Sequence, residues 1–133
     1  MLTRRGFAGC VLCTLTAGPA ATTVSAQQTG GITRTILGKA DLPDGKFVSI
    51  LAAVEVAPGA VIARHTHPGV ESAIVTEGSL DLSVDGLPDR TVKAGEGYLV
   101  PTGAIHSARN GSAATKLAIT YTVEKDKPLA SPA

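Results

Sequence analysis

Cysteine is nearly absent from this sequence: its 133 residues contain only two, Cys10 and Cys13, and both lie close to the amino terminus. From residue 27 onward there is no thiol, which excludes disulfide bonds, cysteine-ligated zinc and iron–sulfur clusters from that part of the chain. An excess of charge of one sign is also lacking, because ten basic and eleven acidic residues follow residue 26. This balance gives no support to the binding of nucleic acid or of an anionic membrane surface.

A hydrophobic run long enough to cross a membrane is missing too. The apolar stretch at residues 8–21 falls short of the roughly 20 residues that a spanning helix needs, and Gly18 and Pro19 interrupt it. The stretch follows the pair Arg4-Arg5 and ends in small residues, so residues 1–26 are predicted to be a cleaved twin-arginine signal peptide. A lipoprotein cleavage at Cys10 is the weaker alternative, since it would leave almost no hydrophobic region. The protein is therefore expected to be periplasmic or secreted, with no membrane attachment after cleavage.

Helical periodicity is absent from the rest of the chain, where short apolar runs alternate with turn residues. Nine strands are predicted, at residues 32–37, 47–56, 61–67, 71–76, 80–84, 90–92, 98–100, 106–109 and 116–123. They are expected to form one domain over residues 32–124, after a flexible lead at 27–31 and before a disordered tail at 125–133. Many short strands with regularly spaced turns indicate an all-β sandwich or barrel.

The chain has three histidines, and their positions suggest a single metal site. His65 and His67 are two residues apart, so along a strand their side chains point to the same face. A Pro-Gly turn follows, and Glu71 then enters the next strand at a similar depth, whereas His106 has to come from a strand distant in sequence. Three imidazoles and one carboxylate are a ligand set for a first-row divalent metal. A carboxylate inside a small apolar barrel is costly without such a cation.

These residues fall into two motifs that resemble the signatures of the cupin superfamily. The first motif comprises Gly59, His65, His67, Glu71 and Gly78, and the second comprises Gly95, Pro101, Gly103, His106 and Asn110. The resemblance covers about residues 32–123 and implies a double-stranded β-helix, the cupin jelly-roll barrel. By the same resemblance, the three histidines and Glu71 are metal ligands, and the glycines and the proline are turn residues. The chain is similar to small type-2, quercetin-dioxygenase-like cupins, which implies a homodimer.

The ligand set does not identify the metal, since Mn, Fe, Co, Ni, Cu and Zn all accept nitrogen and oxygen ligands. Twin-arginine transport characteristically carries proteins that are already folded. The metal can therefore be loaded in the cytoplasm, where copper and zinc are scarce. This route favours Mn or Fe.

Few proton-transfer groups remain once the histidines are assigned to the metal. Glu71 is a candidate base if it leaves the metal. Tyr121 shares a strand face with apolar residues, so it is either a core tyrosine or a catalytic acid. The remaining candidates are Tyr98, Glu55, Glu77 and Glu96. The positions expected to face the pocket are Val61, Ala63, Ala73, Val75 and Ala108, which predicts a compact apolar pocket.

Two classes of function remain open. A complete ligand set with open coordination positions favours a metal-dependent enzyme that acts on a small organic substrate, dioxygenase-like or with decarboxylase, lyase or isomerase chemistry. The scarcity of acid–base groups favours a non-catalytic cupin that binds a small molecule or a metal. The fold cannot decide between them, because one barrel hosts many activities.

Overall fold

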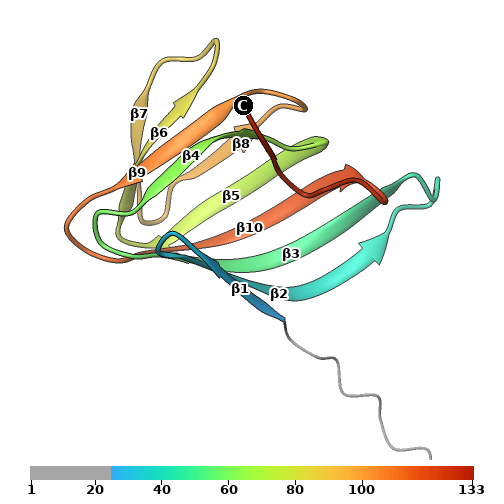
Figure 1. Ribbon diagram of the computed structural model, residues 1–133, viewed down its shortest axis with the longest axis horizontal. Helices are drawn as coiled ribbons and strands as arrows, with labels where there is room; N and C mark the ends of the chain where they lie inside the picture. The colour runs from blue at the N-terminus through green and yellow to red at the C-terminus, as the bar shows by residue number, and fades with distance from the viewer. Residues whose placement is uncertain (1–24) are drawn as a thin grey trace, which may run out of the picture.

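The structure is a computed structural model that describes residues 25–133 (Figure 1). The predicted signal peptide, residues 1–26, lies almost entirely outside the described part. Within residues 25–133, no helix is long and apolar enough to span a membrane. The regular elements of this part are all strands, which confirms the all-β prediction.

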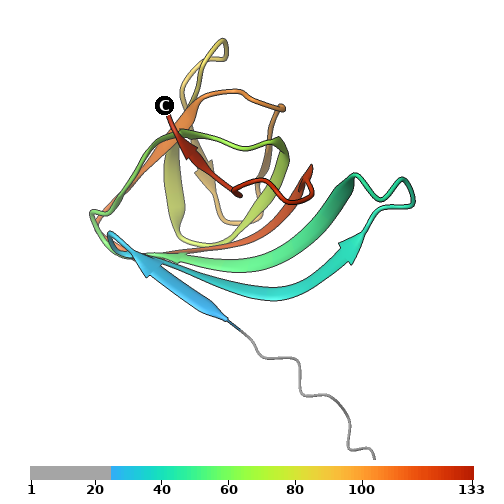
Figure 2. The same cartoon turned by 45° about the vertical axis from the view of Figure 1, so that its right-hand side comes forward.

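Two antiparallel sheets face each other and curve around a common interior (Figures 1 and 2). The strands are β1 (Ala26–Thr29), β2 (Ile32–Asp41), β3 (Phe47–Val56), β4 (Val61–Thr66), β5 (Gly69–Glu77), β6 (Ser79–Val84), β7 (Arg90–Lys93), β8 (Gly97–Val100), β9 (His106–Asn110), β10 (Thr115–Glu124) and β11 (Ser131–Pro132). The six-stranded sheet has the order β1-β2-β3-β10-β5-β8, and the five-stranded sheet has the order β11-β4-β9-β6-β7. The nine predicted strands are therefore present as β2 to β10, in the jelly-roll arrangement that was expected.

The space between the sheets is filled by aliphatic side chains from alternating strand positions. In β3, Ile50, Ala52, Val54 and Val56 are buried, while the residues between them are exposed. Strand β10 lies between β3 and β5 and alternates in the same way. Burial of each such valine, leucine or isoleucine stabilises the fold by about 1.5–3 kcal/mol. This alternation fixes which residues reach the interior.

Strand β4 departs from simple alternation. Its pairing with β9 shifts register between Ile62 and His65, so the chain contains an irregularity just before the histidines. Ile62 packs against the core, whereas Val61 is 51% exposed and Ala63 is also exposed. The prediction that Val61 and Ala63 face the pocket is therefore wrong, because it assumed an unbroken period of two. Ala73, Val75 and Ala108 are buried as predicted, and Ala108 also lines the cavity beside the histidines.

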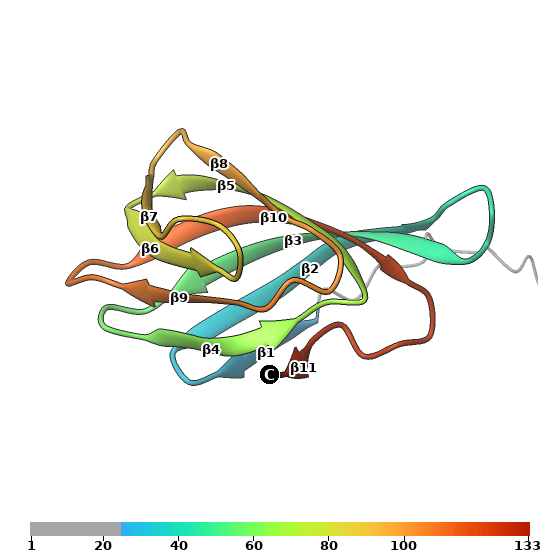
Figure 3. The ribbon, with the colours of Figure 1, turned by 90° about the horizontal axis from the view of Figure 1, so that it is seen from above.

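Both ends of the described chain are ordered, contrary to expectation. The lead at 27–31 was expected to be flexible, but β1 pairs with β2 along its whole length. The tail at 125–133 was expected to be disordered, but β11 pairs with β4 opposite His65 and Thr66 (Figure 3). β1 forms a local hairpin with β2, whereas β11 pairs with a strand distant in sequence, and the polar sequence of neither segment indicates a strand.

Tight turns join the strands, and their glycines confirm the turn role implied by the motifs. Gly59, Gly78, Gly95 and Gly103 all have positive φ, between 70° and 86°. At Gly78 a Cβ atom would also lie 2.6 Å from Thr115 Oγ1 and 2.8 Å from the carbonyl oxygen of Ala114. Both backbone conformation and space therefore require glycine at this turn.

Candidate metal centre

Four side chains converge between the two sheets. His65 comes from β4, His67 from the turn between β4 and β5, Glu71 from β5 and His106 from β9. His65 and His106 are directly opposite each other in the β4–β9 ladder, which accounts for the meeting of residues 41 positions apart. One ligand atom from each residue can be chosen so that all four lie within 4.8 Å of one another. The structure thus brings together the four residues predicted to be ligands.

Backbone carbonyls orient the three imidazoles. The Nδ1 atom of His65 lies 2.8 Å from the oxygen of Ala63, that of His106 lies 3.1 Å from the oxygen of Ala104, and that of His67 lies 2.6 Å from the oxygen of Leu129. A carbonyl only accepts, so each Nδ1 carries the proton and donates it. Each Nε2 is then left with its lone pair, which is the tautomer that binds a metal.

Two of these lone pairs have no protein hydrogen-bond donor. The Nε2 atoms of His67 and His106 are buried and have no hydrogen-bond partner within the described part of the chain. A buried polar atom without a partner is costly. A cation placed between the imidazoles would satisfy both, so the donor set fits a divalent transition metal.

Glu71 completes the donor set and stays charged. Its Oε2 atom lies 2.8 Å from His67 Nε2 and 3.4 Å from His106 Nε2, and its Oε1 atom accepts a hydrogen bond of 2.9 Å from the hydroxyl of Tyr98. Burial acts to raise the pKa of Glu71, but His67 and His106, when their Nε2 atoms are protonated, outweigh it and hold the pKa well below its usual range. One oxygen is therefore directed to the metal position while the other is held by Tyr98.

The histidines differ in their tendency to take up a proton. Burial is the main influence on His65 and lowers its pKa, which favours the neutral ligand form. Burial also acts to lower the pKa of His106, but the nearby carboxylate of Glu71 favours the protonated imidazole and raises the pKa overall. Protons therefore compete with a metal more strongly at His106 than at His65.

A cavity of about 60 Å³ opens beside the ligands. Its polar lining consists of His65, Glu71, His106, Tyr98, Tyr121, Arg34 and Ser107, and the rest is mostly aliphatic. Tyr121 is buried and faces this cavity, as its strand parity predicted, with its ring centre 5.0 Å from that of His67. Its hydroxyl accepts a hydrogen bond from Arg34 Nε at 3.3 Å.

Sequence reasoning gave too little weight to Tyr98 and missed Arg34. Tyr98 shares the parity of the buried Val100, and that pattern places it inward. Arg34 lies between Ile32 and Ile36 on the apolar face of β2, so it is a single charge on a core-facing stripe. Both signals are present in the sequence, but neither residue belongs to the two motifs.

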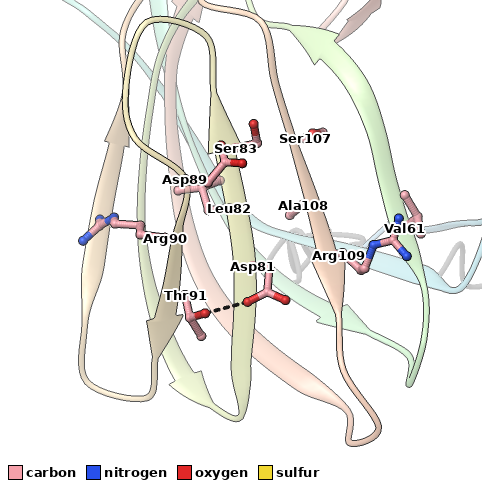
Figure 4. A pocket seen from close by; sticks show the side chains of 10 residues that line it. All are labelled: Val61, Asp81, Leu82, Ser83, Asp89, Arg90, Thr91, Ser107, Ala108 and Arg109. Atoms are coloured by element: carbon pink, nitrogen blue, oxygen red, sulfur yellow. Dashed lines mark hydrogen bonds between the residues drawn. The ribbon is translucent and has the colours of Figure 1, made fainter.

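The other charged candidates lie outside the cavity. Glu55, Glu77 and Glu96 are exposed, and Arg64 points away from the ligands and pairs with Asp85 at 2.8 Å. Figure 4 shows a separate hollow on the five-stranded sheet, lined by Asp81, Ser83, Asp89, Arg90, Arg109 and their neighbours. It contains none of the histidines, so the metal-ligating chemistry belongs to the barrel interior.

A family model described as a cupin domain matches residues 52–122. Germin-like protein subfamily 2 member 4 of Arabidopsis thaliana is 34% identical over 83 residues, which cover 59% of this chain and 38% of that relative. Putative germin-like protein 3-2 of Oryza sativa subsp. japonica is 36% identical over 74 residues, which cover 52% of this chain and 33% of that relative. The matched region thus spans about a third of the length of these relatives.

Solved structures share the fold. A cupin described as RmlC-like from Shewanella frigidimarina has a TM-score of 0.64 and 22% identity, over 77% of this chain and 86% of that one. An oxalate oxidase in complex with the substrate analogue glycolate has a TM-score of 0.61 and 21% identity, over 88% of this chain and 62% of that one. Such identities establish a common architecture only. The match of the cupin-domain model to more than half of the sequence shows that this chain belongs to the cupin family.

Proposed function

We propose that this protein is a mononuclear metal cupin. In this proposal the Nε2 atoms of the three histidines and Oε2 of Glu71 hold one divalent transition metal, with Mn or Fe favoured and Ni, Co, Cu or Zn as alternatives. The observation that carries the proposal is the pair of buried Nε2 atoms without a hydrogen-bond partner, both directed at the same carboxylate oxygen.

We further propose that the centre is catalytic and dioxygenase-like, acting on a small organic substrate. Four protein ligands leave coordination positions open, and the cavity lies directly beside them. A bound metal supplies Lewis-acid or oxygen-activating chemistry there. The small cavity, and the shared fold with an oxalate oxidase that binds glycolate, support a substrate of few atoms.

The side chains around the centre are better suited to holding a metal and orienting a bound molecule than to transferring protons. The depressed pKa of Glu71 favours a ligand role over the role of a base. Burial raises the pKa of Tyr121 to about 12 and that of Tyr98 further, so both hydroxyls stay protonated and act as hydrogen-bond donors or acceptors. The same scarcity of acids and bases supports the alternative function, a non-catalytic cupin that binds a metal or a small molecule.

Elemental analysis of natively produced protein tests the metal proposal. We expect about one equivalent of a first-row metal per chain in the wild type and its loss in His67→Ala and Glu71→Gln. Glu77→Gln is the matched control, because its carboxylate is exposed and paired with Lys116. A metal content unaffected by His67→Ala would contradict the proposed site. Oxygen uptake with a panel of phenols and small carboxylates then separates the enzyme from the non-catalytic alternative.

We also propose export through the twin-arginine route to the periplasm or the medium. The support is the pair Arg4-Arg5 and the short apolar stretch that follows it. Replacing both arginines by lysine should leave the protein in the cytoplasm, as measured by cell fractionation. Normal export of that variant would argue against this route.

A further inference from the structure

Arg34 places a positive charge inside the cavity that adjoins the metal ligands. It lies on β2 opposite the buried Val54, and its neighbours of the same parity, Ile32 and Ile36, pack against the core. Its side chain lines the cavity together with His65 and Glu71. Arg34 is the one lysine or arginine in that lining.

Two contacts with Tyr121 hold the guanidinium in place. Nε donates to the tyrosine hydroxyl at 3.3 Å, and the central carbon Cζ lies 5.6 Å from the centre of the ring. This geometry combines a hydrogen bond with a cation–π interaction. The hydrogen bond uses Nε, not the terminal Nη groups, whose donors are suited to a bidentate ligand.

No carboxylate neutralises this charge within residues 25–133. Lys116, Lys125, Lys127 and Arg64 each form an ion pair, whereas Arg34 forms none. The acidic residue of the cavity, Glu71, already interacts with Tyr98 and two imidazoles. A cation that is partly removed from water without a counter-charge is costly.

A divalent metal at the proposed site would increase that cost. Glu71 balances only part of the charge of such an ion, so the guanidinium and the metal centre repel each other across the cavity. An anion placed between them interacts favourably with both. The cavity therefore has the electrostatics of an anion site even though its walls are mostly aliphatic.

We propose that Arg34 is the substrate-recognition residue of this cavity and that it binds a carboxylate of a small oxygen-bearing acid. The planar carboxylate matches the fork of the two Nη groups, and a second oxygen of the same molecule faces the metal position. A cavity of about 60 Å³ suits a small ligand. Tyr121 acts as a positioning residue that holds the guanidinium. This inference rests on the proposed metal site.

Calorimetric titration of the metal-loaded protein tests the proposal, with glycolate and ethylene glycol as probes. Both molecules have two carbons and a terminal hydroxyl group, but only glycolate carries a charged carboxylate in place of the second hydroxyl. We expect the wild type to bind glycolate at least tenfold more tightly, and Arg34→Met to lose this preference with a tenfold to hundredfold drop in glycolate affinity. Arg34→Lys keeps the positive charge but loses the two parallel Nη donors, so its glycolate affinity should lie between those of the wild type and Arg34→Met. Arg109→Met, which removes an exposed arginine of β9, should bind glycolate as the wild type does.

The possible failures can be told apart. Full metal content with glycolate binding that is unchanged in Arg34→Met overturns the role of Arg34 and leaves the metal proposal intact. Failure of the wild type to take up metal overturns the metal site, and the inference with it. Tighter, Arg34-dependent binding of inorganic phosphate overturns the assignment to carboxylates. If Arg34→Met does not fold, Arg34→Lys decides: a loss of glycolate affinity below twofold contradicts the proposal.

Discussion

Tyr98 is the residue that holds the carboxylate of the donor set. Its hydroxyl donates to Glu71 Oε1 at 2.9 Å, which leaves Oε2 directed at the imidazoles. Removing a hydrogen bond to a ligand typically weakens metal binding by about tenfold or more. We therefore expect Tyr98→Phe to lower metal affinity about tenfold, as measured by competition with a chelator.

Tyr121→Phe is the matched control for that experiment. Its hydroxyl hydrogen-bonds to Arg34 and not to a ligand, so metal affinity should stay within about twofold of the wild type. Equal losses in both variants would mean that the effect comes from the cavity as a whole and not from the hydrogen bond to Glu71.

Asn110 stabilises the barrel by joining three segments of the chain. Its Nδ2 group lies 2.9 Å from the carbonyl oxygens of Val56, Ala57 and Ala113, and its Oδ1 accepts from Thr115 Oγ1 at 2.8 Å. Because the side chain is buried, Asn110→Ala would leave several polar groups without partners. We expect the free energy of unfolding to fall by about 3 kcal/mol in urea denaturation.

The neighbouring Ser112→Ala serves as its control, since that residue is exposed and a change there should stay within about 0.5 kcal/mol. A loss below about 1 kcal/mol in Asn110→Ala would show that water replaces the amide at this position.

At the scale of elements, alternation predicted the strands well and failed where a strand is irregular or polar. The alternating apolar residues of β3 and β10 are buried as a period of two requires. Because of the register shift in β4, Ile62 faces the interior in place of Val61 and Ala63. No local sequence pattern indicates this shift. Strands β1 and β11 carry few apolar residues, so only their partners, β2 and β4, define them.

The carboxyl-terminal segment contributes directly to the candidate centre. The carbonyl oxygen of Leu129 accepts the hydrogen bond from His67 Nδ1, and the strand that follows pairs with β4 beside His65. A chain that ends after Lys127 should therefore bind metal about tenfold more weakly, with its β-sheet circular dichroism retained.

The variant Leu129→Ala distinguishes the effect of losing the Leu129 carbonyl from the effect of losing its side chain. The variant keeps the backbone oxygen and removes only apolar packing, so its metal affinity should change much less than that of the truncated chain. Similar losses in both would show that the segment acts through packing and not through the hydrogen bond to His67.

At the scale of the whole molecule, the convergence of the candidate ligands was predictable and their surroundings were less so. The spacing of His65, His67 and Glu71 was enough to predict that their side chains meet, and the structure confirms that they do. The contacts that orient the imidazoles and the guanidinium join residues far apart in the sequence, such as Leu129 with His67 and Arg34 with Tyr121. Such pairs are set by the order of strands in the sheets, and one sequence carries no direct signal of that order.

The two tyrosines of the chain report on the integrity of the barrel, because both line the same cavity. Burial raises the pKa of Tyr121 to about 12 and raises that of Tyr98 as well, whereas an unfolded chain titrates both near pH 10. The unfolded state therefore loses these protons first, so the stability present below pH 10 should decline as the pH rises toward 12. Tyr121 alone would account for about 2–3 kcal/mol of that loss.

Ultraviolet absorbance of tyrosinate should show no titration near pH 10 in the folded protein and two tyrosines titrating there in urea. Tyr121→Phe should lose less stability over this range than the wild type. Ionisation of both tyrosines near pH 10 without unfolding would mean that the cavity is open to water, and it would contradict the buried hydrogen bond from Tyr98 to Glu71.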